Sequence, residues 1–244
     1  MAWLRLKASI FARKPLDNHP MIWSPSRKFC FIHISKTGGT SIEEAYTPHI
    51  RFGDVVLAAL PEGIDRWYGK SMSAGKHSSA HRISRLAGKS VFAEMFSIAV
   101  VRDPLERMVS YYRWIHSYDH QGERERGLRA ITNFVEFIEQ WPTFLPKQTR
   151  MVCDYESGER LVTFLIPFPK IAEGWNQVAS FLEIDSALPH VNASEKRIPL
   201  EISSEAQEKV YDIFADDVQL FEAALRDFPV GNAPEIAPLV SKKR

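Results

Sequence analysis

Cysteine is scarce in this chain, with only two residues, Cys30 and Cys153, among 244. Two cysteines give no disulfide framework, and Cys30 lies within an apolar stretch, where we predict a buried free thiol. Long hydrophobic runs are absent too, because no segment reaches the roughly 18 consecutive apolar residues of a membrane helix. The formal net charge is only +1. No global field therefore favours nucleic acid, and any anion site must be local.

Length and composition predict one soluble globular domain with a substantial core. Apolar residues make up 45% of the chain and charged residues 25%. We assign residues 1–28 to an N-terminal arm, 29–228 to the domain and 229–244 to a loose C-terminal tail. The arm has neither a continuous apolar centre nor a clear cleavage site. We therefore predict a cytoplasmic protein and leave open whether the arm touches a membrane.

The most informative stretch runs from Phe29 to Ser41. An apolar run of strand length breaks into the loop Lys-Thr-Gly-Gly-Thr-Ser, and a helix-like pattern follows. The first N–H groups of that helix and the positive end of its dipole suit an anion. Thr40 is predicted as the N-cap, with Glu43 completing a capping box. The glycines let the backbone bend and let an oxyanion approach closely. We therefore predict a phosphate- or sulfate-binding loop that begins at Lys36.

A second strand–turn–helix unit lies farther along the chain. Met95–Val101 is apolar and rich in β-branched residues, and it stops at Arg102. Asp103 as N-cap, Pro104 at the first helical position and Glu106 at the third predict a firm helix start. A cationic residue thus stands at the end of this strand as well.

Besides a helix start expected over 77–86, the rest of the chain predicts one more strand, three more helices and a polar turn. Short apolar strands that alternate with amphipathic helices are typical of a parallel sheet covered on both faces. We predict an α/β protein with a three-layer P-loop-like fold, a mainly parallel sheet flanked by helices. The further elements are expected over Leu161–Ile166 (strand), 133–141, 171–182 and 204–225 (helices, the last capped by Ser204 and Gln207) and 121–127 (turn).

A Gly-rich loop between a strand and a helix invites comparison with the nucleotide-binding P-loop, G-x-x-x-x-G-K-[ST]. Here the lysine precedes the glycines and no Lys-Ser/Thr pair follows them. No strand ends in an obvious magnesium-binding aspartate, and the loop is too short to wrap two phosphates in that manner. A P-loop kinase or nucleotide hydrolase is therefore the weaker alternative. A single tetrahedral anion with its leaving group suits the loop better.

Four blocks of sequence resemble those of sulfotransferases that use 3′-phosphoadenosine 5′-phosphosulfate (PAPS). The resemblance is to the family that includes the heparan sulfate 2-O- and chondroitin/dermatan sulfotransferases and bacterial relatives. The first block is Phe31–Ile42, and the second, Val101–Tyr112, resembles R-[DN]-P-x-x-R-x-x-S-x-Y. The third is Gly75–Ala80 and the fourth is Leu188–Ser194. Each block alone is a weak signal, but four in family order are specific.

The resemblance implies PAPS as the cofactor, with 3′-phosphoadenosine 5′-phosphate (PAP) as its product. Lys36 would contact the phosphosulfate and offset the charge on the bridging oxygen as the S–O bond breaks. Arg102 and Ser110 would bind the 3′-phosphate, a task that suits the planar fork of arginine. The 5′-phosphate would be held by backbone N–H groups and two hydroxyls of the loop, from Thr37, Gly38, Gly39, Thr40 and Ser41.

Sulfuryl transfer to a hydroxyl requires a base, and histidine is a natural candidate near neutral pH. His77, in the third block, is predicted as that base, and His81 is the alternative one turn later. The resemblance implies direct in-line transfer, without a covalent enzyme intermediate or a metal ion, to a carbohydrate or glycolipid. A module that binds the nucleotide without catalysis is a further alternative. The acceptor, the position sulfated and the oligomeric state stay open.

The chain departs from the family pattern at two places. Ser35 stands where a proline is usual, which loses rigidity but no chemical group. Leu165–Phe168 replaces a region where many relatives have Arg-x-Glu, so acceptor binding or local bracing differs there. The membrane-spanning stem of the eukaryotic relatives is not found, and we therefore expect a soluble bacterial enzyme.

Overall fold

A computed structural model describes residues 21–56, 77–117, 122–189 and 199–229 of the chain. At its centre lies a five-stranded sheet in the order β3-β1-β2-β4-β5. The strands are β1 (Ile22–Ser24), β2 (Phe29–Ile32), β3 (Val55–Val56), β4 (Phe96–Val101) and β5 (Phe164–Pro167). The sequence predicts β2, β4 and β5, and each of these three leads toward a helix.

The three predicted strands run parallel. Ile32 of β2 pairs with Ala99 of β4, and Val101 pairs with Pro167 of β5. On the other side of β2, β1 and then β3 are added in antiparallel pairs. The sequence predicts neither of them, because strands of two or three residues are too short to show a period. Since β1 lies within the stretch assigned to an N-terminal arm, the sheet begins before Phe29.

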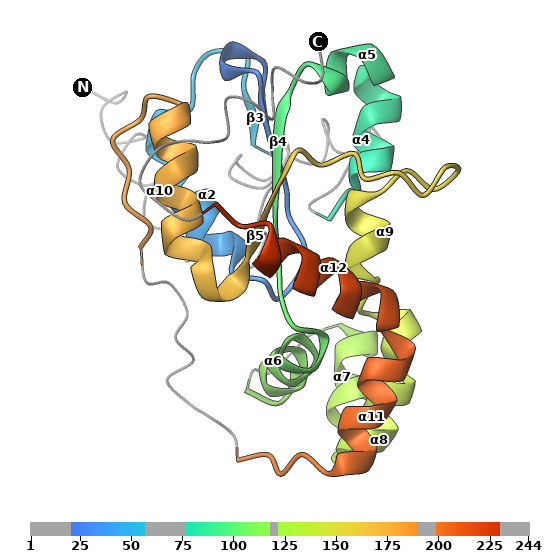
Figure 1. Cartoon of the computed structure of the whole chain (residues 1–244). Coiled ribbons are helices and arrows are strands. Elements are labelled where there is room, and N and C mark those ends of the chain that lie inside the picture. The colour runs from blue at the N-terminus through green and yellow to red at the C-terminus, as the bar shows by residue number, and fades with distance from the viewer. Residues whose placement is uncertain (1–20, 57–76, 118–121, 190–198, 230–244) are drawn as a thin grey trace, which may run out of the picture.

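Helices cover both faces of the sheet (Figure 1). The α/β fold with three layers is confirmed, and the three longest strands of its sheet are the parallel ones. The helices on one face are α2 (Gly39–Tyr46) and α10 (Ile171–Phe181), and those on the other are α4 (Ala80–Ala87), α5 (Lys89–Ala93), α9 (Gln148–Val152) and α12 (Ala215–Arg226).

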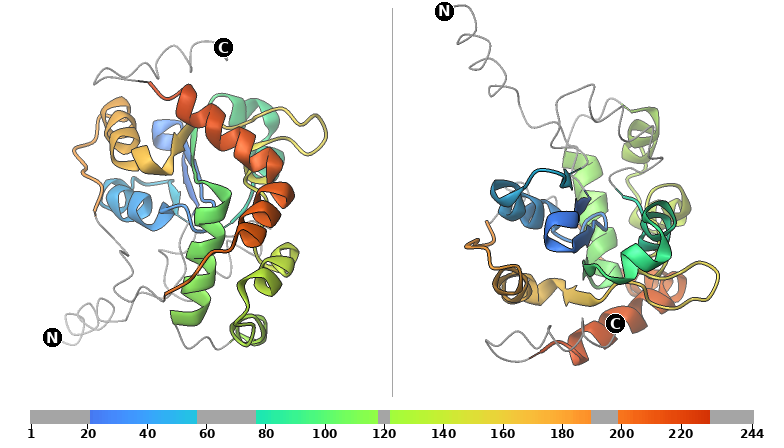
Figure 2. Two further views of the ribbon diagram at one scale, coloured as in Figure 1. Left: turned by 60° about the horizontal axis from the view of Figure 1, so that its bottom comes forward. Right: turned by 90° about the horizontal axis from the view of Figure 1, so that it is seen from above.

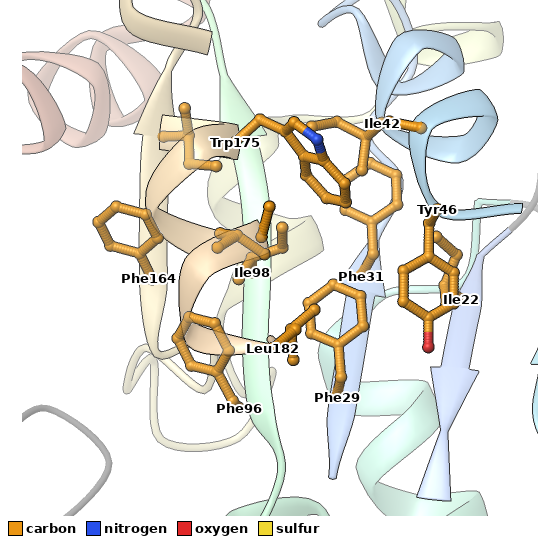
Figure 3. Packing of buried hydrophobic residues seen from close by; sticks show 14 of the residues in the cluster. Ile22, Phe29, Phe31, Ile42, Tyr46, Phe96, Ile98, Phe164, Trp175 and Leu182 are labelled. Atoms are coloured by element: carbon orange, nitrogen blue, oxygen red, sulfur yellow. The ribbon is translucent and has the colours of Figure 1, made fainter. Parts of the chain in front are cut away.

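Side chains of the strands alternate between two hydrophobic clusters. Phe29 and Phe31 of β2 pack with Trp175 in the cluster beneath α2 and α10, which Figure 3 shows from close by. Cys30 and Ile32 belong to the cluster beneath α4, α9 and α12. Both faces of the sheet are therefore apolar, as a parallel sheet between helices requires. Cys30 is fully buried, as predicted, and burial raises the pKa of its thiol.

A third hydrophobic cluster lies beyond the sheet, where α6 (Pro104–Ser117) packs beside α8 (Phe134–Glu139) and α11 (Ser204–Ile213), as Figure 2 shows. Two predicted helix starts are confirmed there. The Asp103 carboxylate accepts from the N–H of Glu106 at 2.9 Å, and the Asn133 side chain accepts from the N–H of Glu136 at 3.0 Å. Both caps satisfy N–H groups that the helix itself leaves without an acceptor.

Two predictions, of a polar turn and of one long helix, are wrong. Of the stretch 121–127, expected to be a solvated turn, residues 123–127 belong to α7 (Glu123–Arg129), which buries Leu128 in the third cluster. The long C-terminal helix is two helices that meet at Phe214. Phe214 is buried in the third cluster whereas Ala224 of α12 packs in the second, so the chain turns between them. The N-cap of α11 is Ser203, whose hydroxyl accepts from the N–H of Ala206 at 3.1 Å.

Short 3₁₀ turns complete the described part of the chain, in which we find no helix long and apolar enough to cross a membrane. Several sequence predictions lie outside the described residues: 1–20 of the arm, Gly75 and Lys76 of the third block, 190–194 of the fourth block, and the tail from 230 onward. The division into arm, domain and tail stays a prediction. The 3₁₀ turns are Pro25–Arg27, Thr47–His49, Trp141–Thr143 and Phe168–Lys170.

Candidate active site

Two loops meet at one edge of the sheet. Because β2 and β4 are parallel neighbours, the chain leaves both strands at the same edge. The loop after β2 carries Lys36, and Arg102 directly follows the last residue of β4. The guanidinium Nη1 of Arg102 donates to the carbonyl oxygen of Lys36 at 3.4 Å. The two segments predicted to bind anions therefore contact each other.

The loop enters α2 through left-handed backbone. Lys36 has φ 65°, and Gly38, at the N-cap position, has φ 80°. Glycine adopts this conformation without steric cost, whereas lysine does not. The helix begins at Gly39, so the prediction that Thr40 is its N-cap is wrong, and Thr40 lies in the first turn. Among the predicted phosphate donors, the N–H of Ser41 already donates to the Gly38 carbonyl at 3.1 Å.

Side chains beneath the loop fix its shape. The buried Thr37 hydroxyl donates to the Ile34 carbonyl at 2.8 Å. His33 is only 3% exposed and lies under the loop, as predicted. A Cβ on Gly39 would approach Cδ2 and Nε2 of His33 to 2.3 Å, far inside van der Waals contact. Glycine at this position is thus required because His33 leaves no room for a side chain, in addition to the predicted close approach of an anion.

Arg102 is held through its backbone and its side chain. Its N–H donates to Gln148 Oε1 at 2.9 Å, and its carbonyl accepts from Gln148 Nε2 at 2.7 Å. The guanidinium lies 4.2 Å from the ring centroid of Phe168, and its Nε donates to Glu106 at 3.2 Å. Burial lowers the pKa of Arg102, and the hydrogen bond and charge of Glu106 oppose this shift. Arginine remains cationic in either case, so an anion can compete with the exposed Glu106 carboxylate for it.

One face of α6 lies beside both Lys36 and Arg102. Glu106, Ser110 and Trp114 are spaced four residues apart and so share a side of the helix. Glu106 bonds Arg102, and the Lys36 ammonium lies 5.2 Å from the ring centroid of Trp114. Ser110, which is half-buried, stands between these two contacts on the helix. The structure thus places Ser110 on the face that Lys36 and Arg102 approach, which spacing alone does not show.

The two candidate bases are held in different ways. His77 Nδ1 lies 3.0 Å from the carbonyl oxygen of His33, which can only accept, so Nδ1 carries a proton and Nε2 is the basic nitrogen whenever the ring is neutral. His81 Nδ1 instead accepts from the N–H of Tyr155 at 3.2 Å, and its ring stacks on Tyr155 with centroids 4.3 Å apart. His77 is therefore tied to the start of the loop that carries Lys36, and His81 is tied to another segment.

Three buried polar residues support these loops, and the sequence assigns a role to none of them: Arg107 and Gln148, which contact the loops, and Asp217, which contacts Gln148 and Arg107. Arg107 Nε donates to the carbonyl of Ser35 at 3.0 Å, next to Lys36. Burial lowers the pKa of Arg107 to about 10, and the charge of Asp217 opposes this shift. Two signals for Arg107 were available, because it is the second arginine of the pattern R-[DN]-P-x-x-R-x-x-S-x-Y and it occupies a position on α6 where the helical period calls for an apolar residue. Gln148 and Asp217 stand out by no comparable pattern.

The arrangement brings together cations and a helix N-terminus, which suit anionic groups, and the His77 imidazole, a group of the type that acts as a general base. The model of the family described as "Sulfotransferase family" matches residues 19–223. Comparisons with curated proteins and with solved structures found no match. The matched region includes both strand–loop–helix units and spans most of the chain, so the resemblance to sulfotransferases is confirmed. The chain belongs to the sulfotransferase family, and it is a transferase of the class that moves sulfuryl groups.

Proposed function

We propose that this sulfotransferase uses PAPS as its donor and transfers the sulfuryl group directly to a hydroxyl of a carbohydrate or glycolipid. The observation that carries the proposal is the contact between the Lys36 loop and Arg102 at the end of the neighbouring strand. Two cations on adjoining loops beside a helix N-terminus fit a donor that is anionic at two positions. PAPS has a 5′-phosphosulfate and a 3′-phosphate, and when bound it supplies the sulfuryl group.

Each half of the donor has its own set of proposed partners. Arg102 and Ser110 hold the 3′-phosphate, and Glu106 releases the guanidinium to it. Lys36 holds the phosphosulfate and offsets the negative charge that grows on the leaving oxygen, which is the most effective use of a fixed cation. The 5′-phosphate is held by the first turn of α2 and the residues before it, from Thr37, Gly38, Gly39, Thr40 and Ser41.

His77 is proposed to accept the proton of the acceptor hydroxyl on Nε2. The hydrogen bond from Nδ1 to the His33 carbonyl supports this role, since it fixes the tautomer whose Nε2 is basic. The same bond orients the ring relative to the start of the Lys36 loop. His81 is less suited, because its Nδ1 and its ring face are both occupied by Tyr155.

The acceptor class rests on family resemblance rather than on a described pocket. Acceptor sites on such scaffolds are built from loops, here proposed to be 47–76 and 117–127, and residues 57–76 and 118–121 lie outside the described part. Membership of the bacterial branch is proposed from the third sequence block. A cytoplasmic location remains a prediction of the sequence.

The test is transfer of radiolabelled sulfur from PAPS to a panel of oligosaccharides and glycolipids, with three variants. Asparagine in His77→Asn keeps a donor near the position of Nδ1 and has no basic ring nitrogen. We expect the transfer rate to fall by about 100-fold or more in His77→Asn and His77→Ala. Both variants should bind PAP like the wild type, and His81→Ala should remain active.

Other outcomes separate the alternatives. Full activity in His77→Asn would show that the base lies elsewhere, and loss of transfer in a folded His81→Ala would point to His81. Binding of PAP with no transfer to any acceptor favours a non-catalytic module. Preference for magnesium-ATP over PAP would favour the P-loop kinase or hydrolase instead.

A further inference from the structure

Asp217 is a carboxylate in the interior of the protein. It lies in the first turn of α12 and is 0% exposed. Its Oδ2 accepts from the N–H of Gln148 at 2.7 Å, and its Oδ1 accepts from the N–H and the hydroxyl of Thr149, both at 2.9 Å. These donors open α9, so Asp217 anchors the N-terminus of that helix from another helix. A buried carboxylate needs such partners, because losing water is otherwise costly.

Gln148, which Asp217 holds at the start of α9, in turn binds the backbone of Arg102. Its side chain is fully buried and makes two hydrogen bonds to the Arg102 backbone, one to the N–H at 2.9 Å and one from Nε2 to the carbonyl at 2.7 Å. An amide that pairs with both backbone groups of one residue fixes the position and direction of that residue. The position of the Arg102 backbone at the end of β4 therefore depends on where Asp217 holds α9.

Arg107 links Asp217 to the other loop. Its Nη1 lies 3.9 Å from Asp217 Oδ2 and donates to the Pro146 carbonyl at 2.9 Å. Its Nε and Nη2 donate to the carbonyl and the hydroxyl of Ser35, at 3.0 and 3.3 Å. Ser35 immediately precedes Lys36, so the chain of contacts ends at the proposed phosphosulfate ligand. The serine that replaces the usual proline here supplies one of these acceptors.

The structure assigns to Asp217 the role of positioning residue for both anion-binding loops at once. Together with Gln148, Thr149 and Arg107 it forms a buried unit, the Asp217 network, that connects Ser35 to Arg102 through α9 and α12. This inference rests on the proposed function, because it takes Arg102 as a ligand of the 3′-phosphate and Lys36 as a ligand of the 5′ end. The network sets the relative placement of these two cations.

Gln148→Met tests the Arg102 arm of the network without leaving a buried charge. Methionine has a similar length and cannot pair with the Arg102 backbone. The measurement is calorimetric affinity for PAP and for adenosine 5′-phosphate, which lacks the 3′-phosphate. We expect affinity for PAP to fall about tenfold, the equivalent of one weakened hydrogen bond to a charged group, while affinity for adenosine 5′-phosphate stays within about twofold. A merely structural role would leave the ratio of the two affinities unchanged.

Asp217→Asn tests the whole network, and Asp216→Asn is its matched control. Asp216 is the preceding residue, but its carboxylate is 67% exposed and lies 3.5 Å from the ammonium of Lys147. We expect the Asp217 variant to bind both nucleotides more weakly and the Asp216 variant to bind both like the wild type. Should Asp217→Asn fail to fold, as judged by circular dichroism, Gln148→Met alone decides.

The outcomes distinguish this inference from the proposed function. If the wild type prefers PAP and a folded Gln148→Met keeps the full preference, the positioning role is overturned while the proposed function stands. If the wild type binds PAP no better than adenosine 5′-phosphate, the proposed function fails and the inference fails with it.

Discussion

Gly39→Ala is the substitution whose effect follows most directly from the structure. A Cβ at this position would lie 2.3 Å from two atoms of the His33 ring and 2.9 Å from a third. The ring cannot step aside freely, because it is 3% exposed, stacks on Phe31 at 5.5 Å and meets the His77 ring at 5.0 Å. The new methyl group therefore displaces either His33 or the start of α2.

The expected cost is that of overpacking a close-packed interior. Inserting a methyl group into such a site costs about 1–3 kcal/mol, and the better helix propensity of alanine returns roughly 0.5–1 kcal/mol of this. We therefore expect Gly39→Ala to lower the free energy of unfolding by about 1 kcal/mol net, which in a protein of this size lowers Tm by about 2–4 °C. Urea titration followed by circular dichroism measures the first quantity, and a thermal melt the second.

The double variant His33→Ala/Gly39→Ala identifies the cause. Without the ring the clash is gone, so Gly39→Ala in the His33→Ala background should be neutral or slightly stabilising. The coupling free energy of the cycle should then be about 2 kcal/mol, within the range for residues in contact. An equal loss of stability in both backgrounds, or a loss below about 0.5 kcal/mol in the wild type, would refute the assigned contact.

Three further predictions concern caps, backbone and thiols. Asp103→Ala removes the cap of α6 and should cost about 1 kcal/mol in urea titration, whereas Asp103→Asn should cost much less. Gly38→Ala should cost more than the about 1–2 kcal/mol of left-handed backbone alone, because its Cβ would lie 2.9 Å from a carbon of Ile171 in α10. Gly53→Ala should cost only the backbone part, because Gly53 has φ 89° and its Cβ would have no atom of the described residues within 4 Å. A disulfide reagent should label at most one thiol in the native protein, that of the half-buried Cys153 rather than the buried Cys30, and Cys153→Ser should abolish the labelling.

The parallel core of the fold could be predicted from the sequence, since β2, β4 and β5 are apolar runs that lead toward amphipathic helices. The antiparallel strands β1 and β3 could not, because at two or three residues their placement depends on pairing with β2 and with each other. The break between α11 and α12 at Phe214 could not be predicted from the sequence for a related reason. An apolar pattern can continue through a point where the chain changes from one cluster to another.

The residues of the candidate site likewise fall into those that the sequence predicts and those that it does not. Lys36 and Arg102 could be found because each follows a strand in a motif of local residues. Gln148 and Asp217 could not, because their contacts to Arg102 and to the start of α9 join positions far apart in sequence. The N-cap of α2 was predicted two residues too late, because Gly38, in left-handed backbone, occupies the position that Thr40 suits by residue type.

The most direct test of the account is calorimetric titration of the wild type with PAP, adenosine 5′-phosphate and magnesium-ATP, repeated with Arg102→Ala and Lys36→Ala. The account predicts micromolar binding of PAP, weaker binding of the other two, and loss of affinity in both variants. Preference for magnesium-ATP, or no nucleotide binding by well-folded protein, would contradict it.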